Sequence, residues 1–285
     1  MNQIALSFDL EFWYNSELLK KELSSVDIGA FDDRVILQTE KIIELLKNNN
    51  AHATFFVLGK LAEKYPALIK SVADAGHEIA SHGYSHTALP KLTPESFETE
   101  IIKSKTILES ITGKSVTGFR APAFSLTPAT SWAIPILIKH GFKYDSSIFP
   151  SRLSHYGHGT ALLEPYRISA DNIYHSDTAS RLLEIPTAII QYFHIRIPIS
   201  GGIYFRALPY WLFRVLLRKH LATRPALLYF HPHEFDTTIT SYVPSSPMEY
   251  KKKLLYMNYS SASAKLANLL HDFNGVSIEK YYDIV

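Results

Sequence analysis

The sequence predicts an α/β protein built on a parallel sheet, and three observations lead to this prediction. Short apolar runs alternate with amphipathic stretches along the 285 residues, which is the pattern of consecutive βαβ units. No linker rich in Gly, Ser or Pro interrupts the alternation, so a single domain spanning 1–285 is expected. Polar residues capable of chemistry follow several of the apolar runs, as they do at the carboxyl face of parallel α/β barrels.

The first half of the chain contains regular elements with clear ends. The helix expected after Thr93 begins with Thr-Pro, a good N-cap followed by proline at the first helical position, and Gly113 ends it. Gly76 likewise ends the preceding helix. The elements expected in this half are strands at 4–12, 53–59 and 77–81 and helices at 32–50, 66–75 and 93–112.

The second half is less regular, above all between residues 147 and 206. A second Thr-Pro start at Thr127 predicts a helix that Gly141 ends. The run from Ser200 to Arg206 contains two adjacent glycines and is interpreted as a loop. The elements expected here are strands at 118–120, 182–186, 227–231 and 276–278 and helices at 127–140, 207–221 and 247–273.

Composition restricts the class of protein. With 46% hydrophobic and 20% charged residues, the chain is an ordinary globular protein that can bury a large core. A formal net charge of +2 gives no basis for binding nucleic acid, and the lysines at 251–253 are expected on a solvated helix face. The absence of cysteine excludes disulfides and thiolate metal ligands.

The N-terminus and the apolar segments indicate in which cellular compartment the protein is expected. The first residues form a strand pattern without the basic and apolar regions of a signal peptide. No run reaches the roughly 18 apolar residues that span a bilayer. A cytoplasmic protein without an integral membrane segment is therefore expected. The segment 207–221 is apolar with aromatic and basic flanks, so it is interpreted as a core-packed helix, with contact to a membrane surface as the alternative.

Two pairs of residues predict a metal site. His82 and His86 are four residues apart, so on one helical turn both imidazoles would face the same ion. Asp9 and Glu11 lie two residues apart at the end of the first strand, where alternation places them on one face. Two histidines and one carboxylate would hold a zinc-like ion with an open position for water, and the second carboxylate could serve as a base. The set predicts a metal-dependent hydrolase. The simpler interpretation is a chance spacing among 13 histidines and two solvated carboxylates.

Five candidate residues lie at or just beyond the carboxyl ends of expected strands. Active sites of parallel α/β barrels are built at this face, and five such positions are a stronger indication than any one of them. The residues are Asp9, His82, Arg120, Asp145 and His231.

The order of these motifs resembles the NodB-homology polysaccharide deacetylases of carbohydrate esterase family 4, up to about residue 235. The histidine block is most specific when joined to the Ala-Gly-His-Glu-Ile run at 75–79. Around residues 8–13, 200–206 and 231–235 the chain resembles the branch associated with exopolysaccharide and surface-glycan biosynthesis. The five matching blocks are Ser7-Phe8-Asp9-Leu10-Glu11, His82-Gly83-Tyr84-Ser85-His86, Phe119-Arg120-Ala121-Pro122, Tyr144-Asp145-Ser146 and Leu228-Tyr229-Phe230-His231-Pro232.

The resemblance implies a fold, a reaction and a cofactor. The fold would be a distorted, incomplete (β/α)7-type barrel with a family-specific C-terminal part from about residue 200. The reaction would be hydrolytic removal of an N-acetyl group, or of an N-formyl group, from an amino sugar. That sugar would belong to a polysaccharide or to its lipid- or nucleotide-linked precursor. One divalent metal ion would be bound, with zinc as the first choice and other transition metals as alternatives.

The resemblance also assigns the metal ligands and the base. Glu11, His82 and His86 would hold the ion, and Asp9 would be the base. The first block of the family commonly carries two adjacent aspartates, whereas this chain has Leu10 at the second position. The role of Glu11 therefore follows branches with an acidic-x-acidic spacing, and Asp9 is the alternative ligand.

The remaining roles follow from the other blocks. Arg120 would pair with Asp9 and keep it ionised, His231 would protonate the leaving amine, and Asp145 would orient His231. A surface ion pair for Arg120 and a core position for His231 are the simpler interpretations. Pro122, Phe124, Tyr204 and Trp13 would line the sugar groove, with Tyr14 as a further candidate, although each could be a core residue.

Three alternatives stay open on the sequence. A cyclic amide hydrolase on the same fold would have a narrow, polar pocket, whereas the 13% aromatic content favours rings that stack on sugars. A catalytically inactive carbohydrate-binding relative would bind no metal and would turn Glu11 away from the histidines. A structural metal site would need a fourth ligand, for which His233 is the candidate. The sequence does not predict the oligomeric state.

Overall fold

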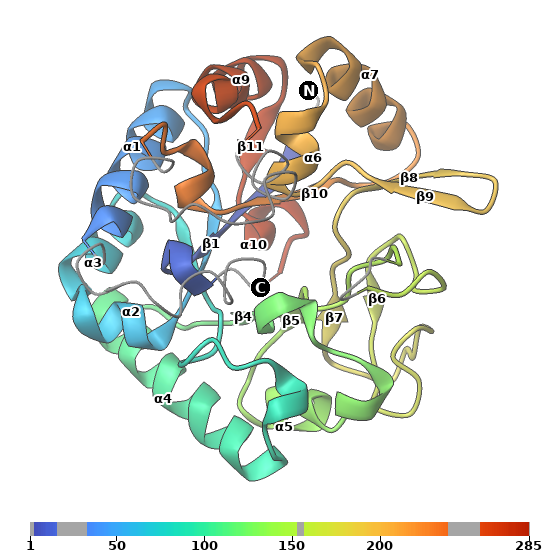
Figure 1. The fold of residues 1–285 in the computed structure, drawn as a ribbon. Helices are drawn as coiled ribbons and strands as arrows, with labels where there is room; N and C mark the ends of the chain where they lie inside the picture. The colour runs from blue at the N-terminus through green and yellow to red at the C-terminus, as the bar shows by residue number, and fades with distance from the viewer. Residues whose placement is uncertain (1–2, 16–32, 153–156, 239–256, 285) are drawn as a thin grey trace, which may run out of the picture.

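The computed structural model describes residues 3–15, 33–152, 157–238 and 257–284 as a mixed α/β fold (Figure 1). The main sheet has the strand order β10-β1-β2-β3-β4-β5-β7-β6, and β11 pairs with the first residues of β1. All neighbours are parallel except β6 and β7. The strands are β1 (Gln3–Leu10), β2 (Thr54–Val57), β3 (Glu78–Ser81), β4 (Gly118–Phe119), β5 (Tyr144–Asp145), β6 (Tyr166–Arg167), β7 (Leu183–Glu184), β10 (Leu227–Phe230) and β11 (Asn274–Val276).

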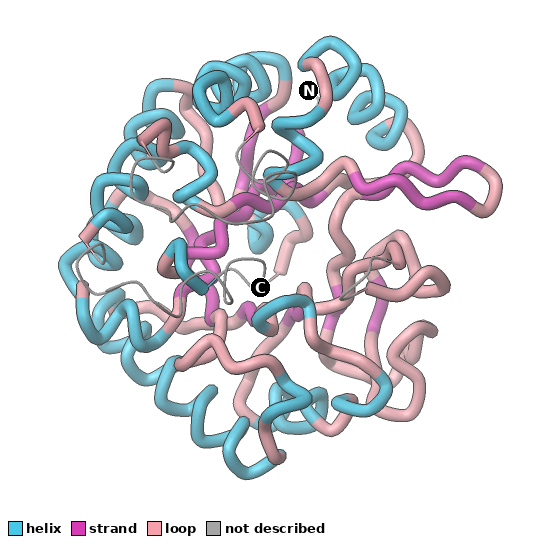
Figure 2. The backbone as a smooth tube through the Cα atoms, viewed as in Figure 1, coloured by secondary structure: helices cyan, strands magenta, loops and turns pink. Residues whose placement is uncertain are grey.

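The sheet curls into an open half-barrel, because its end strands β10 and β6 do not pair with each other among the described residues. Figure 2 shows helices forming an outer layer around the strands. The expected parallel, incomplete barrel is therefore confirmed. The helices are α1 (Arg34–Asn48), α2 (Gly59–Lys64), α3 (Pro66–Asp74), α4 (Pro94–Thr112), α5 (Ala133–Lys139), α6 (Gly202–Ala207), α7 (Tyr210–Leu221), α9 (Tyr259–Asp272) and α10 (Ile278–Tyr281).

The core lies between the sheet and this helical layer. Every residue of β1 from Ile4 to Leu10 is buried, because one face packs under the helices and the other lines the interior of the half-barrel. Phe8 of β1 stacks on Phe55 of β2 with ring centroids 5.2 Å apart. A central strand buried on both faces gives the polar residues at its carboxyl end a rigid base.

The helix ends follow the sequence signals in the first half. Thr93 accepts a hydrogen bond from the backbone of Ser96 and completes a capping box, and Gly113 closes α4 with a φ of 68°. The helix expected at 127–140 begins later than predicted. A 3-10 turn at Pro128–Thr130 precedes α5, which starts only at Ala133.

Two further predictions for the second half were wrong. The glycine-rich run at 200–206 is not a loop, because α6 forms there. A hairpin of β8 (Ile189–Tyr192) and β9 (Ile195–Pro198) occupies part of the section that was expected to be irregular. Of the helix expected at 247–273, α9 forms the described part. Residues 247–256, with the lysines at 251–253, lie outside the described residues.

The apolar segment at 207–221 forms α7, which buries Phe213, Leu217 and His220 against the fold. Across the described parts of the chain, no helix combines the length and the apolar character needed to cross a membrane.

Candidate active site

Residues from four strands of the main sheet converge at its carboxyl edge. Asp9 lies in β1 and Glu11 just beyond it, while His82, Arg120 and His231 follow β3, β4 and β10. The Nε2 atom of His231 lies 4.0 Å from Asp9 Oδ2 and 3.6 Å from Glu11 Oε1. The two carboxylates therefore share a face, as strand alternation predicted.

Arg120 connects the two sides of the curled sheet. Its side chain is fully buried and its guanidinium lies 4.1 Å from the ring centroid of Phe56 on β2. It donates to Asp9 Oδ1 at 2.6 Å and to Ser7 Oγ at 3.1 Å. On the β5 side it donates to the backbone oxygen and the hydroxyl of Ser146, at 3.2 and 3.0 Å. Arg120 is thus an internal support that fixes one oxygen of Asp9, and not a surface ion pair.

Glu11 faces both histidines of the second block. Its Oε2 atom lies 2.5 Å from His86 Nε2 and 3.9 Å from His82 Nε2, and all three side chains are at most 8% exposed. One ligand atom from each residue lies within 4.8 Å of the others. Burial alone would raise the pKa of Glu11, but attraction by His86, His231 and His82 lowers it to about 2. Glu11 is therefore a carboxylate at neutral pH.

These three residues fit a divalent cation. The Nδ1 atom of His82 lies 2.8 Å from the backbone oxygen of Arg120, which can only accept, so Nδ1 carries the proton and Nε2 turns a lone pair towards Glu11. Burial lowers the pKa of His82 to about 4 and keeps its ring neutral. A lone pair thus faces a carboxylate oxygen in a buried place, which a cation between them would stabilise. A backbone carbonyl on the far ring nitrogen is also the usual support of a metal-binding histidine.

The histidines converge through a turn and not through the helical turn that their spacing predicted. Gly83 has a φ of 76° and His86 a φ of 61°, both in the left-handed region. Glu100 of α4 accepts hydrogen bonds from the backbone N–H groups of the two residues between them, at 3.2 and 3.1 Å. The prediction that both imidazoles face one point is confirmed, although its geometric reason was wrong.

His231 is held through its second ring nitrogen by Glu234. Glu234 Oε1 lies 3.6 Å from His231 Nδ1, and Oε2 accepts the backbone N–H of His231 at 3.0 Å. Arg206 of α6 lies 3.2 Å from Glu234 Oε1 and neutralises it. Burial alone would lower the pKa of His231, but the hydrogen bond and charge of Glu234, with the charges of Glu11 and Asp9, raise it to about 9.

Asp145 does not make the contact that the family blocks led us to expect. It accepts the hydroxyl of Ser147 and lies beside Glu184, its register partner on β7. Burial raises the pKa of Asp145 to about 6 and raises that of Glu184 as well. The carboxylates in ionic contact with His231 among the described residues are Asp9, Glu11 and Glu234. The contact with His231 that was expected from Asp145 is thus made by Glu234, which lies three residues after His231 in the same turn.

A second group of ligand-type side chains consists of His231, His233 and Glu234. The rings of the two histidines stack with centroids 5.1 Å apart. The guanidinium of Arg206 already neutralises Glu234, so Arg206 would repel a cation bound at this group. His233 joins this group and not the Glu11 group, which speaks against its being a fourth ligand that would close the metal site.

Pro122 and Phe124 lie in the 3-10 turn (Pro122–Phe124) that follows Arg120. Phe124 is 7% exposed and packs edge-on against Tyr229, with ring centroids 4.9 Å apart. Ala123 and Phe124 both have left-handed φ values, 56° and 48°. Such backbone strain in non-glycine residues concentrates at functional sites.

Trp13 and Tyr204 differ in their access to a ligand. Trp13 is 1% exposed and packs edge-on against Tyr14, which agrees with the core position that the sequence left open as the alternative to lining the sugar groove. Tyr204 is half-buried in α6, two residues before Arg206.

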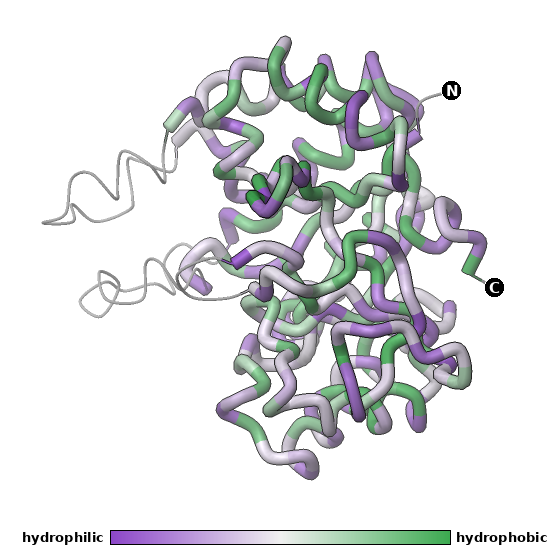
Figure 3. Tube along the Cα trace, turned by 90° about the vertical axis from the view of Figure 1, so that its right-hand side faces the viewer, coloured by the Kyte–Doolittle hydropathy of each residue, from purple (hydrophilic) through white to green (hydrophobic). Residues whose placement is uncertain are grey.

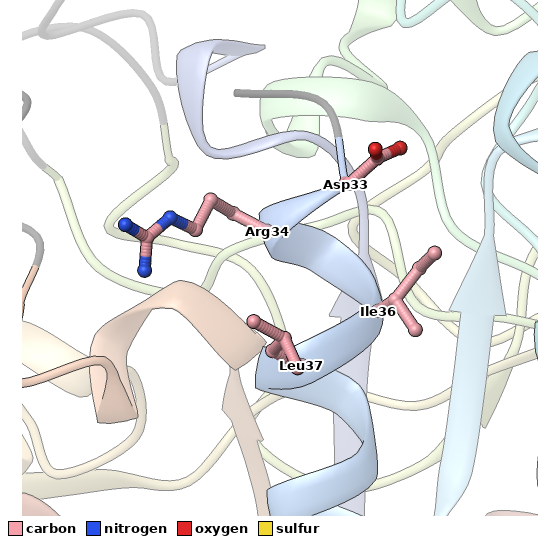
Figure 4. Close-up of a pocket in the computed structure, with 4 residues that line it drawn as sticks. All are labelled: Asp33, Arg34, Ile36 and Leu37. Carbon is pink, nitrogen blue, oxygen red and sulfur yellow. The ribbon is translucent and has the colours of Figure 1, made fainter. Parts of the chain in front are cut away.

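A surface pocket lies elsewhere, at the start of α1. Its lining residues are Asp33, Arg34, Ile36 and Leu37. Figure 4 shows that these side chains diverge from the helix instead of meeting at one point. None of them belongs to the converging histidines and carboxylates, and the pocket therefore carries no catalytic interpretation.

Two family models match the chain. One, described as polysaccharide deacetylase, matches residues 28–144, and the other, described as domain of unknown function (DUF3473), matches residues 146–283. A peptidoglycan deacetylase of Helicobacter pylori is 34% identical over 116 residues, which cover 41% of this chain and 39% of the relative. A peptidoglycan-N-acetylglucosamine deacetylase of Bacillus cereus is 42% identical over 94 residues, covering 33% and 34%. The matches thus span less than half of the relatives' length.

Solved structures share the fold. A Mycobacterium smegmatis protein described as a polysaccharide deacetylase superposes with a TM-score of 0.63 at 20% identity, covering 99% of this chain and 88% of that one. A Bacillus anthracis protein described as a CE4 family pseudoenzyme superposes with a TM-score of 0.52 at 13% identity, covering 98% and 64%. Because the fold is shared with a protein described as a pseudoenzyme, the fold alone does not show activity.

Proposed function

The chain carries a polysaccharide deacetylase domain of carbohydrate esterase family 4, and from this premise we propose that it is a metal-dependent carbohydrate N-deacetylase. The observation that carries the proposal is the convergence of a candidate metal-ligand group, a carboxylate fixed by a buried arginine, and a histidine at one edge of the sheet. Glu11 faces both histidines, and this argues against a carbohydrate-binding protein that has lost its metal.

Glu11, His82 and His86 would hold the ion, and Asp9 would be the base. This division is supported by the contacts, since Glu11 meets both histidines while Asp9 Oδ1 is engaged by Arg120. When bound, a divalent ion would supply Lewis-acid polarisation of the amide carbonyl and lower the pKa of water. The fixed carboxylate of Asp9 would accept the proton of the attacking water.

His231 would donate a proton to the leaving nitrogen, because an amide nitrogen leaves poorly without one. Its Nε2 atom faces the site while Glu234 contacts Nδ1, so the imidazole is oriented with one nitrogen directed at the reacting centre. The atoms that would accept and donate the proton, Asp9 Oδ2 and His231 Nε2, lie 4.0 Å apart at the same edge of the sheet. This arrangement suits hydrolysis of an amide at neutral pH.

The substrate would be an N-acetylated amino sugar, as the names of the peptidoglycan and chitin deacetylase relatives suggest. The proposed substrate is a finished glycan or its lipid- or nucleotide-linked precursor. We further propose that acetyl is removed in preference to formyl, that the ion is zinc, and that the compartment is the cytoplasm. Cell fractionation tests the last of these.

The test of the proposed function is release of acetate and formate from N-acetylglucosamine oligomers and peptidoglycan fragments by zinc-loaded protein. We expect acetate release, and we expect chelation or His82→Ala to abolish it. Lys70→Ala, which removes only an exposed i,i+4 ion pair on α3, is the matched control and should retain full activity. Ring opening of allantoin without acetate release would instead favour a cyclic amide hydrolase.

A further inference from the structure

An apolar surface is exposed on the β8–β9 hairpin and on the neighbouring helix α7. We define this hairpin surface by six side chains that are 46% to 77% exposed, namely Tyr192, Phe193, Ile195, Ile197, Trp211 and Val215. Within the described parts of the chain, the other exposed large hydrophobic side chains are Leu37 and Ile102, at 53% and 44%. Apolar exposure is therefore concentrated in one place, which in soluble proteins marks an interaction site.

The hairpin is amphipathic, and no element among the described residues covers its apolar face. Tyr192 pairs with Ile195 across the strands, and Ile197 lies two residues further along the same face. Gln191 and Arg196 form the opposite pair. The hairpin projects from the body of the molecule in Figure 1, and it points towards the viewer in Figure 3.

The tip of the hairpin places a large aromatic residue where backbone geometry favours glycine. Phe193 is the first residue of the two-residue turn, has a φ of 52° and is 77% exposed. Tight hairpins with a positive φ at this position normally use Gly or Asn, and another residue there costs of order 1 kcal/mol. The strained backbone at Phe193 does not bury its ring in the folded chain. This indicates that the exposed ring serves to contact another molecule.

Helix α7 extends the same surface. Trp211, Val215 and Lys219 follow each other at intervals of four residues along one helix face. The ammonium of Lys219 lies 5.8 Å from the ring centroid of Tyr192, so the helix stripe meets the hairpin. Below them, His220 lies 3.1 Å from the backbone oxygen of Ile189, which fixes the two elements to each other.

Charge identifies the kind of partner. The segment 185–233 contains six Lys and Arg residues and no Asp or Glu, although the whole chain has a net charge of only +2. Arg218 and Lys219 of this segment are exposed beside the apolar side chains. Aromatic rings flanked by basic residues are typical of surfaces that lie at the headgroup level of anionic membranes. A second copy of the chain would bring two cationic surfaces together.

We infer that the hairpin surface docks the protein onto an anionic lipid membrane. Phe193 and Trp211 would enter the headgroup region, and Arg218 and Lys219 would contact lipid phosphates. The inference does not depend on the deacetylase reaction, because vesicle binding requires neither metal nor substrate.

The test is co-sedimentation of the full chain with vesicles of phosphatidylcholine alone or mixed in equal parts with phosphatidylglycerol. We expect binding only to the mixed vesicles, and weaker binding at high salt. Because a surface cation contributes about 1 kcal/mol, or about fivefold, Arg218→Glu with Lys219→Glu should weaken binding by tenfold or more. Phe193→Ser with Trp211→Ser should weaken it by a similar factor.

Leu37→Ser with Ile102→Ser is the matched control, since it removes two apolar side chains elsewhere that are 53% and 44% exposed, and it should leave binding unchanged. All variants are checked for folding by circular dichroism and for association by sedimentation velocity. Equal binding by control and Phe193 variants would overturn the inference. Wild-type protein that binds neither vesicle type would also overturn the inference, whether it is monomeric or forms dimers that Phe193→Ser dissociates.

Discussion

Glu234 contacts the imidazole that would protonate the leaving amine, and this contact distinguishes the site from the arrangement expected by resemblance. His231 Nδ1 lies 3.6 Å from Glu234, while Asp145 is engaged by Ser147 and Glu184. Gly202 of α6 leaves room for the Glu234 carboxylate, because a Cβ there would lie 1.9 Å from Oε2. Orientation of the proton donor thus depends on a neighbouring helix as well as on the strand end.

We predict that Glu234→Gln selectively impairs amide hydrolysis. General acid catalysis contributes roughly 10²- to 10⁴-fold, and loss of orientation should remove about 10- to 100-fold in kcat. Hydrolysis of an aryl acetate should be nearly unaffected, because a phenolate leaves without a proton. The measurement compares kcat for both substrates in Glu234→Gln and Asp145→Asn, with equal folding checked for each. A selective loss in Asp145→Asn, and none in Glu234→Gln, would restore the assignment made from the sequence.

At the scale of elements, helix α4 supports the turn that carries His82 and His86. Glu100 accepts the two backbone N–H groups between Gly83 and His86, and so holds His86 in its left-handed conformation. Loss of such an outer support typically costs 10- to 100-fold in metal affinity.

We therefore predict that Glu100→Ala weakens zinc binding by about 10- to 100-fold while the chain stays folded. Titration of the apo protein with zinc against a competing chelator measures the effect. Glu98→Ala removes the same charge from the same helix, but among the described residues the ion-pair partners of Glu98 are Lys139 and His140, away from this turn. Its zinc affinity should equal that of the wild type, and an equal loss in both variants would refute a specific role for Glu100.

The strand ends could be predicted from the sequence, whereas the connections could not. Asp9, His82 and Arg120 were identified because carboxyl ends of parallel strands meet at one edge. The turn at His86 was missed because a spacing of four residues also fits a helix. The hairpin was missed because Phe193 stands where turn chemistry favours Gly or Asn. α6 was missed because two adjacent glycines resemble a loop, although Gly202 is there to make room for Glu234.

For the whole molecule, a buried histidine directly before β3 lowers stability in acid. His77 is 5% exposed, packs against Phe55, and has no hydrogen-bond partner for either ring nitrogen among the described residues. Burial, with the nearby His52, lowers the pKa of His77 to about 4. Between about pH 6.5 and 4 the imidazole of His77 is therefore protonated in the unfolded chain and neutral in the folded chain.

We predict that His77 contributes a loss of stability as the pH drops through this window, on the order of 3 kcal/mol for the full shift from 6.5 to about 4. His77→Leu should flatten this loss and should not destabilise the protein at pH 7, because it removes an unsatisfied polar group. Urea unfolding at several pH values tests both points. The exposed His175→Leu is the control and should keep the slope of the wild type. An unchanged slope in His77→Leu would show that other groups govern acid unfolding.

The most direct test of the site is the metal content of zinc-loaded, desalted protein together with acetate release, measured for wild type, Glu11→Ala, His82→Ala and Asp9→Asn. We predict about one ion per chain in wild type and Asp9→Asn, and little in the other two variants. All three variants should lose at least about 100-fold in acetate release. Wild-type protein that binds no ion would contradict the metal site. An ion retained by Glu11→Ala and lost by Asp9→Asn would contradict the assignment of ligand and base.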